Sequence, residues 1–287
     1  MEAALQIRNL CKSYKKSDFR LENVSIKIPS GSIMGFVGKN GAGKSSTINA
    51  VLNIIQKDSG DVTIFGENMA DDNRMIRNDI GVVFDSIHFS GELTPKKLEK
   101  VCRDIYGNWQ REQFFSYLER FKIPKAMKIK TLSRGMAMKL SVSVALSHKA
   151  RLLILDEATA GLDPVAREEL LDLLLEFVED EGHSIFMSSH MSSDLERVAD
   201  YITFIDQGKI ILTEEKDILL YQYGIARMKQ SDFEKLTSSE YLVARKRGLQ
   251  MEALVQNKGR FSRKHPSIVV DNTTIDEILP LLTQEDV

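Results

Sequence analysis

The sequence has 287 residues, 43 % of them hydrophobic and 28 % charged, which is the balance of a globular protein with one large domain or a domain plus an appendage. A formal net charge of −2 gives no reason to expect nucleic acid as a partner. The sequence shows no signal peptide, no apolar run approaching the roughly 18 residues of a membrane span, and no metal-ligand spacing at Cys11 and Cys102, which are expected to be reduced thiols.

The N-terminal part is predicted to lead from strands into a phosphate-binding loop. Apolar patterns predict strands over 5–10, 21–28 and 33–37. The third strand runs into an octapeptide that fits G-x-x-x-x-G-K-[ST], namely Gly38-Lys39-Asn40-Gly41-Ala42-Gly43-Lys44-Ser45. Apolar residues at helical spacing then predict a helix over 44–55.

This strand, loop and helix form an anion-binding site. Backbone N–H groups surround the phosphates, the helix N-terminus adds its dipole, and glycine lets the backbone approach closely. Lys44 is expected to reach the β- and γ-phosphates, and the Ser45 hydroxyl to ligate Mg²⁺, with Ser46 beside them. A Gly-rich turn that fits by chance is the alternative, but it is rare in this context. The sequence therefore predicts binding of a nucleoside triphosphate, with ATP and Mg²⁺ as the cofactors.

The rest of the chain alternates between strands and helices. Short apolar runs between turn signals predict strands at 60–66, 80–84, 151–155, 184–188, 200–205 and 209–212. Three helices are predicted between Thr94 and 149, the first with a Thr94-Pro95 start, and another helix follows Asp163-Pro164. These patterns divide the chain into an N-terminal part of the ATP-binding core (1–87), a helical subdomain (88–149), the C-terminal part of the core (150–220) and a small accessory module (221–287).

The accessory module carries less apolar periodicity, with a strand-like segment at 267–270 and a helix at 274–282. Between Tyr241 and His265 it has one anion, Glu252, and seven cations: Arg245, Lys246, Arg247, Lys258, Arg260, Arg263 and Lys264. A solvated face is the plainer interpretation of this basic stretch. Contact with anionic lipid headgroups or with a partner subunit is the alternative.

Four further segments narrow the class of nucleotide-binding protein. Thr131-Leu132-Ser133-Arg134-Gly135-Met136 precedes a buried strand that ends in Asp156-Glu157; Ala160-Gly161-Leu162-Asp163 follows, and His190 comes after the next strand. In this order and spacing the set resembles the ATP-binding cassette (ABC) ATPases, over residues 5–215 or so. The resemblance implies an α/β P-loop NTPase of ABC type, with a mixed sheet, N-terminal antiparallel strands, a helical insert and a small C-terminal α/β appendage.

The resemblance and the chemistry of phosphoryl transfer imply roles for four residues. Asp156 would hold Mg²⁺ through water, and Glu157 would polarise the attacking water. His190 would contact the γ-phosphate and orient that water, and Tyr14 would stack on adenine. The alternatives are a surface carboxylate at Glu157, an ordinary capped histidine at His190 and simple packing at Tyr14.

The Ser133 segment implies a second subunit. In the family it begins a helix whose N-terminus caps the γ-phosphate held by the other cassette, so this chain is expected to pair with itself or with a paralogue. Arg134 and Met136 replace a glycine and a glutamine of the usual signature, whereas Ser133 and Gly135 are kept and are expected to contact nucleotide. Asp85 replaces the glutamine that the family carries after the strand at 80–84. It is expected to lie at the nucleotide site and to reach Mg²⁺ through a water molecule.

In the length of the chain, its short C-terminal tail and the variant signature at 132–136, the sequence resembles the ATPase subunits of bacterial ABC-2-type exporters. This group includes exporters of phenol-soluble modulins and antimicrobial peptides. The expected function is an ABC-type ATP hydrolase that powers export of a drug, peptide or other small substrate through a separate integral-membrane subunit. It would then lie peripherally on the cytoplasmic face of the membrane. An importer subunit, or an ABC ATPase that acts without a membrane partner, is the alternative.

Overall fold

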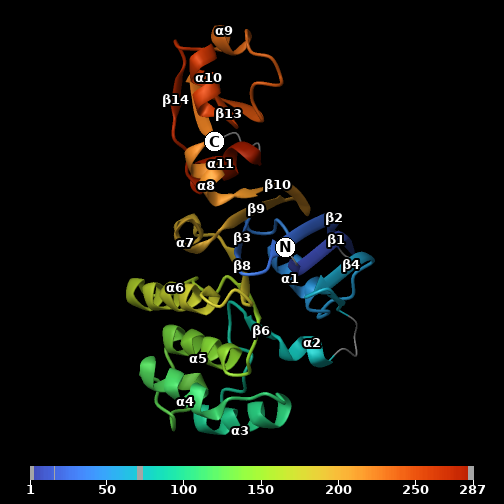
Figure 1. The fold of residues 1–287 in the computed structure, drawn as a ribbon, viewed down its shortest axis with the longest axis vertical. Helices are drawn as coiled ribbons and strands as arrows, with labels where there is room; N and C mark the ends of the chain where they lie inside the picture. Colours follow the sequence, from blue (N-terminus) through green and yellow to red (C-terminus); the bar gives the residue numbers. More distant parts are fainter. Residues whose placement is uncertain (1–2, 16, 70–73, 284–287) are drawn as a thin grey trace.

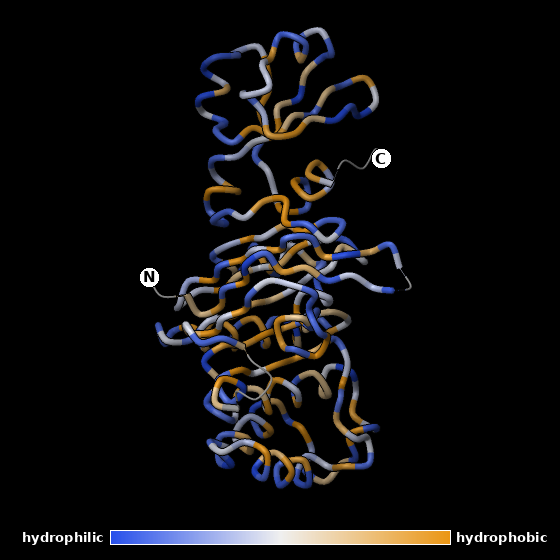
Figure 2. The backbone as a smooth tube through the Cα atoms, turned by 90° about the vertical axis from the view of Figure 1, so that its right-hand side faces the viewer, coloured by the Kyte–Doolittle hydropathy of each residue, from blue (hydrophilic) through white to orange (hydrophobic). Residues whose placement is uncertain are grey.

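The computed structural model describes residues 3–15, 17–69 and 74–283 (Figure 1). Helices α3, α4 and α5 lie at one end of the molecule and the C-terminal module lies at the other, with two β-sheets between them. Hydrophobic stretches run through the central strands, and hydrophilic stretches follow many of the outer turns (Figure 2). Among the described residues no helix is both long enough and apolar enough to cross a bilayer.

The first sheet is antiparallel and has the order β2-β1-β4-β5. Its strands are β1 (Ala3–Tyr14), β2 (Ser17–Pro29), β4 (Ser59–Ile64) and β5 (Glu67–Asn68). Strands β1 and β2 form a hairpin in which Tyr14 pairs with Ser17. The predicted antiparallel strands at the N-terminus are confirmed.

The second sheet holds the phosphate loop and has the order β10-β9-β3-β8-β7-β6. Its strands are β3 (Ile33–Val37), β6 (Ile80–Val83), β7 (Leu152–Asp156), β8 (Ser184–Ser189), β9 (Tyr201–Asp206) and β10 (Lys209–Glu215). Every neighbouring pair is parallel except β9 and β10. Parallel strands place their carboxyl ends at one edge, so the segments that follow β3, β7 and β8 meet there.

The central strands are buried on both faces because successive side chains point to opposite sides. In β7, Leu152 and Ile154 join the core beneath the antiparallel sheet, whereas Leu153 and Leu155 join the core on the helical side. A continuous apolar run is the sequence pattern that this arrangement requires, which is why the strand could be predicted from its sequence.

Helices cover these sheets and form the insert. They are α1 (Lys44–Val51), α2 (Arg74–Asn78), α3 (Pro95–Ile105), α4 (Arg111–Arg120), α5 (Arg134–Leu146), α6 (Pro164–Val178) and α7 (Ser192–Val198), with a 3₁₀ turn at Ile129–Thr131. The expected extension of α1 to residue 55 is wrong. Asn53 adopts a left-handed backbone (φ 53°), and the amides of Ile54 and Ile55 both donate to the Asn49 carbonyl, which ends the helix.

The C-terminal module is a four-stranded antiparallel sheet of order β12-β13-β11-β14 with short helices. Its elements are β11 (Gly224–Met228), α9 (Gln230–Phe233), β12 (Val243–Arg247), β13 (Gln250–Val255), α10 (Lys258–Lys264), β14 (Val269–Asp271) and α11 (Ile275–Leu282), and α8 (Lys216–Tyr221) leads into it. The sequence predicted a strand near β14 and the helix α11, but missed the two central strands β11 and β13.

Helix α11 belongs to the main core as well as to the module. Ile275, Ile278 and Leu281 are fully buried in the same hydrophobic cluster as the helical side of the large sheet. Ser192 of α7 donates a hydrogen bond to Asp276, and Glu196 accepts one from the Ile275 amide at 2.7 Å. The predicted boundary at residue 221 therefore divides a core that is continuous in the structure.

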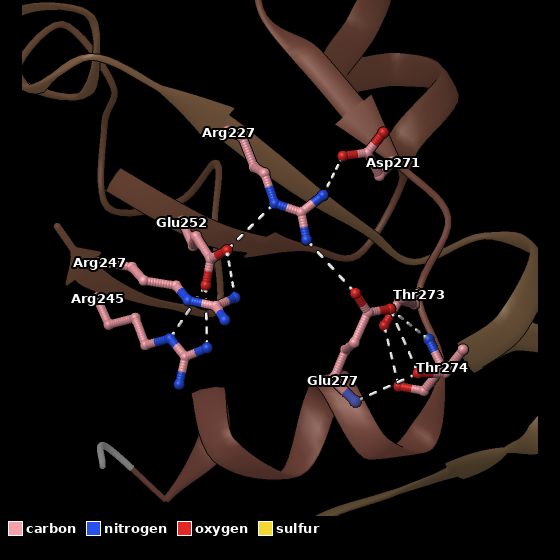
Figure 3. A network of polar contacts seen from close by, with 8 residues as sticks. All are labelled: Arg227, Arg245, Arg247, Glu252, Asp271, Thr273, Thr274 and Glu277. Atoms are coloured by element: carbon pink, nitrogen blue, oxygen red, sulfur yellow. Dashed lines mark hydrogen bonds and ion pairs between the residues drawn. The ribbon is translucent and has the colours of Figure 1, made fainter. Parts of the chain in front are cut away.

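A buried carboxylate organises the sheet of the module (Figure 3). The side chain of Glu252 is 5 % exposed and accepts hydrogen bonds from Arg227 at 3.1 Å, Arg245 at 3.0 Å and Arg247 at 3.4 Å. Arg227 also contacts Asp271 of β14 and, at 3.4 Å, Glu277 of α11. Burial raises the pKa of Glu252, but the hydrogen bonds from Arg227 and Arg245 outweigh it and hold that pKa below its ordinary value.

We expect Glu252→Gln to destabilise the protein by about 3 kcal/mol, because it leaves partly buried guanidinium groups without a countercharge. The depressed pKa of Glu252 means that its contribution is present above pH 4.5 and is lost as the pH falls further. Thermal unfolding at pH 7 and at pH 4 measures both effects. The exposed Glu234→Gln is the control, and equal unfolding temperatures for the two variants at pH 7 would contradict this role.

Contacts within the module give partners to part of the basic stretch between Tyr241 and His265. Four of its seven cations have partners: Arg245 and Arg247 on Glu252, Lys258 on Asn272, and Lys264 on Glu240. In the part of the chain that the structure describes, Lys246, Arg260 and Arg263 have no side-chain partner. Most of these cations therefore stabilise the module itself, and only these three are free to meet a lipid headgroup or a partner.

Candidate active site

A cleft of about 870 Å³ lies at the carboxyl edge of the large sheet, above the phosphate loop. Most of the residues predicted for nucleotide binding and catalysis line it: Tyr14, Lys39, Asn40, Gly41, Gly43, Lys44, Ser45, Ser46, Asp85, Glu157 and His190. Gly38, Ala42 and Asp156 are buried next to lining residues in the sequence, and Ser133 and Gly135 lie at the start of α5. The fold therefore brings the residues that line the cleft together from five separate parts of the chain: Tyr14, the phosphate loop, Asp85, Glu157 and His190.

The phosphate loop has the backbone of an anion cradle. Gly41 and Gly43 adopt positive φ angles of 80° and 118°, which disfavour any residue with a side chain. A Cβ on Gly38 would lie 2.4 Å from the Ile205 carbonyl oxygen, so the loop can pass close to β9 only with glycine there. These features fit the phosphates of a nucleoside triphosphate on the N-terminus of α1.

Lys44 is the buried cation of the site. Its Nζ donates to the carbonyl oxygens of Gly38 at 2.7 Å and Lys39 at 3.3 Å, and lies 3.3 Å from Oε1 of Glu157. Only 6 % of this side chain is exposed. The contacts hold the ammonium group at the floor of the cleft, where it can contact the phosphates.

The carboxylate of Glu157 lies between the ammonium group of Lys44 and the imidazole ring of His190. One carboxylate oxygen contacts Lys44, and the other accepts hydrogen bonds from Nδ1 of His190 and, at 3.2 Å, from the His190 amide. Burial raises the pKa of Glu157, but the His190 hydrogen bond and the Lys44 charge outweigh it, so that pKa is lowered. The carboxylate is therefore ionised near neutral pH, as a general base must be.

Backbone geometry aims Glu157 into the cleft. Its φ is 54°, a left-handed conformation that costs free energy in a glutamate and must be held by its surroundings. The Glu157 amide donates to the hydroxyl of Ser188 at 3.1 Å, and that hydroxyl donates to Oδ1 of Asp156 at 2.6 Å. Ser188 thus positions both acidic residues. Sequence reasoning missed it, although it is a small polar residue two positions before His190 in a buried strand.

The side chains of Ser45, Asp85 and Asp156 carry the oxygen atoms that were predicted to hold Mg²⁺. Within the described residues no three His, Cys, Asp or Glu side chains converge on one point. Mg²⁺ commonly takes one or two protein oxygens and completes its shell with phosphate oxygens and water, so Ser45, Asp156 and Asp85 fit it when nucleotide is bound. The ion would neutralise charge on the phosphates. Asp85 is exposed and accepts a hydrogen bond from Ser86 at 3.2 Å.

The other end of the cleft is aromatic. The rings of Tyr14 and Phe19 both line it, with centroids 6.1 Å apart, and Lys12 lies 5.7 Å from the Tyr14 ring. Such a surface suits the face of a nucleobase. Phe19 was missed because its place depends on the β1–β2 hairpin, which brings β2 back beside Tyr14.

The fold and this cleft define a P-loop nucleoside triphosphatase. The sequence matches the ABC transporter family over residues 21–160. It is 35 % identical over 215 residues to the lantibiotic transport ATP-binding protein SrtF of Streptococcus pyogenes, covering 74 % of this chain and 91 % of that protein. It is 32 % identical to the bacitracin transport ATP-binding protein BcrA of Bacillus licheniformis, covering 74 % and 69 % respectively.

Among solved structures, the ATP-binding subunit of an ABC transporter superposes with a TM-score of 0.69 at 25 % identity, covering 75 % of this chain and 91 % of that one. The chain therefore belongs to the ABC transporter family, as an ATP-hydrolysing ATP-binding subunit. The predicted fold and class of enzyme are confirmed.

Proposed function

We propose that this chain is the ATPase subunit of an exporter for drugs or amphipathic peptides, working with a separate integral-membrane subunit at the cytoplasmic face of the membrane. The observation that carries the proposal is Glu157 held between Lys44 and His190 over the phosphate loop. The names of SrtF and BcrA, which are transport subunits for a lantibiotic and for bacitracin, support the class of cargo.

In the proposed reaction, each step is carried out by residues of this chain. Lys44 and the loop amides bind and orient the phosphates. Glu157 accepts a proton from the attacking water, and His190 fixes the orientation of the carboxylate that does so. Tyr14 and Phe19 hold the base. Asp85 lies at the exposed edge of the cleft, next to residues 86–89, and couples the site to the membrane subunit.

The transport role is tested with inside-out vesicles from cells that produce this chain together with the membrane protein encoded beside it. We expect ATP-dependent uptake of a labelled amphipathic peptide, and no uptake with Glu157→Gln. If the purified chain hydrolyses ATP but neither binds a membrane protein nor supports uptake, the exporter proposal fails while the ATPase assignment stands.

Two chains are proposed to complete each other's sites, with Ser133 of one chain facing the nucleotide of the other. Specific ATPase activity should then rise with subunit concentration. Chains with Lys44→Ala and chains with Ser133→Arg should each be inactive alone. When mixed, they should recover activity, because one composite site per mixed pair has an intact loop and an intact signature. Activity that is independent of concentration, with no recovery on mixing, would refute the shared site.

A further inference from the structure

The first turn of α11 links the C-terminal module to the segment that carries His190. Ser192 begins α7 two residues after His190, and only 4 % of it is exposed. Its hydroxyl donates a hydrogen bond to the carboxylate of Asp276, the second residue of α11. Ser192 and Asp276 are 84 positions apart in the sequence, so they meet only because α11 docks on the core.

The module holds Asp276 in place. Thr274 and Glu277 form a capping box, in which each side chain accepts a hydrogen bond from the backbone amide of the other residue. Arg227 of β11 donates to the Glu277 carboxylate at 3.4 Å (Figure 3). The first turn of α11 is therefore fixed to the sheet of the module on one side and to α7 on the other.

The first turn of α7 depends on neighbouring helices for its position. Its N-cap residue, Met191, makes no side-chain capping hydrogen bond. Arg167 of α6 donates to the Ser193 hydroxyl at 2.7 Å and also contacts the buried carboxylate of Asp194. Asp276 supplies the polar contact to this turn from the side of α11. The backbone that follows the catalytic histidine is thus held between α6 and α11.

His190 needs this support because its side chain has few contacts of its own. Its side chain is 52 % exposed, and among the described residues its ring makes a hydrogen bond only to Glu157. The His190 amide donates to the same carboxylate at 3.2 Å. Both contacts depend on where the backbone of 190–192 lies, so a shift of that backbone would change the orientation of the ring and of the Glu157 carboxylate together.

We infer that Asp276 is a positioning residue for ATP hydrolysis, which acts through Ser192 to hold the His190 segment in place. The C-terminal module then supports the chemical step and not the binding of nucleotide. The inference rests on the role proposed for His190 and gives the module a function in the same reaction.

The test measures single-turnover hydrolysis of ATP and the dissociation constant for Mg·ATP in the same variants. Asp276→Ala should slow hydrolysis about fivefold, the effect of losing one hydrogen bond of ordinary strength, and leave the dissociation constant within about twofold. Asp276→Asn should keep most of the rate, because its amide oxygen still accepts from Ser192. The matched control is Asp217→Ala, which removes an exposed acidic residue from the first turn of α8 and should hydrolyse ATP normally.

Combined variants show whether Asp276 acts through Ser192 and His190. The double variant Ser192→Ala, Asp276→Ala should be no slower than either single variant. In a His190→Ala background, Asp276→Ala should cause no further loss of rate. A merely structural role would slow hydrolysis equally in both backgrounds, and that result would overturn the inference.

A wild-type rate in both Asp276→Ala and Ser192→Ala would also overturn it, while a slow His190→Ala protein would leave the proposed role of His190 standing. If His190→Ala itself hydrolyses ATP at the wild-type rate, the proposed role of His190 fails. These two failures are therefore distinguished by the His190→Ala protein alone.

Discussion

Replacing Lys44 with alanine should raise the dissociation constant for Mg·ATP by about a hundredfold or more, equivalent to about 2.7 kcal/mol. Lys44 is the one buried cation among the described residues of the cleft, and its ammonium group is already oriented by the carbonyls of Gly38 and Lys39. Its loss removes the attraction for the β- and γ-phosphates and leaves the Glu157 carboxylate facing them. Fluorescence titration with a labelled ATP analogue measures the change.

Lys27→Ala is the matched control, because Lys27 is an exposed lysine on β2 away from the cleft. It should bind nucleotide as the wild type does. Lys44→Ala protein with an unchanged dissociation constant and a wild-type unfolding temperature would show that the phosphates bind elsewhere.

Replacing Glu157 with glutamine should slow ATP hydrolysis by about a hundredfold or more and leave binding intact. Glutamine keeps the shape of the side chain but cannot accept a proton from water. Because it also removes the countercharge of Lys44, ATP should bind at least as tightly as before. ATP would then persist in the proposed shared sites, and gel filtration with ATP should show more dimer than the wild type does.

The exposed Glu179→Gln, at the end of α6, is the control for the loss of one carboxylate and should hydrolyse ATP normally. A Glu157→Gln protein with wild-type turnover would place the base elsewhere. Asp156 would then be the first residue to examine, because it lies one position away and shares the Ser188 hydroxyl.

The sequence predicted the phosphate loop and the acidic pair because the chemistry of these segments lies in consecutive residues. The loop needs glycine at fixed positions, and Asp156 and Glu157 follow a strand whose apolar run shows that it is buried on both faces. Ser188 and Phe19 could not be assigned in the same way. Their roles depend on a register between strands and on a hairpin, which are set by contacts between distant segments.

The C-terminal module was harder to predict for a related reason. Arg227 and Glu252 interrupt the apolar patterns of β11 and β13, so neither segment looks like a central strand. The two residues are paired across the strands, and Arg245 pairs with Glu252 from the other side. A buried charge is tolerated only with such partners, and the sequence alone does not show which residues will be neighbours.

The position of α11 has a consequence for the synthesis of the protein. Its residues leave the ribosome after those of the phosphate loop and the large sheet, yet they join Leu195 of α7 and Leu254 of β13 in the same cluster as the core of the large sheet. Domains commonly fold as they emerge, from the N-terminus onwards. Here we expect one side of the ATPase core to stay open until α11 has been translated, with its apolar side chains exposed to chaperones and proteases for that time. A chain that ends before residue 275 would keep its complete phosphate loop and signature. We expect chaperones and proteases to bind it nevertheless, because apolar side chains of its core would stay exposed.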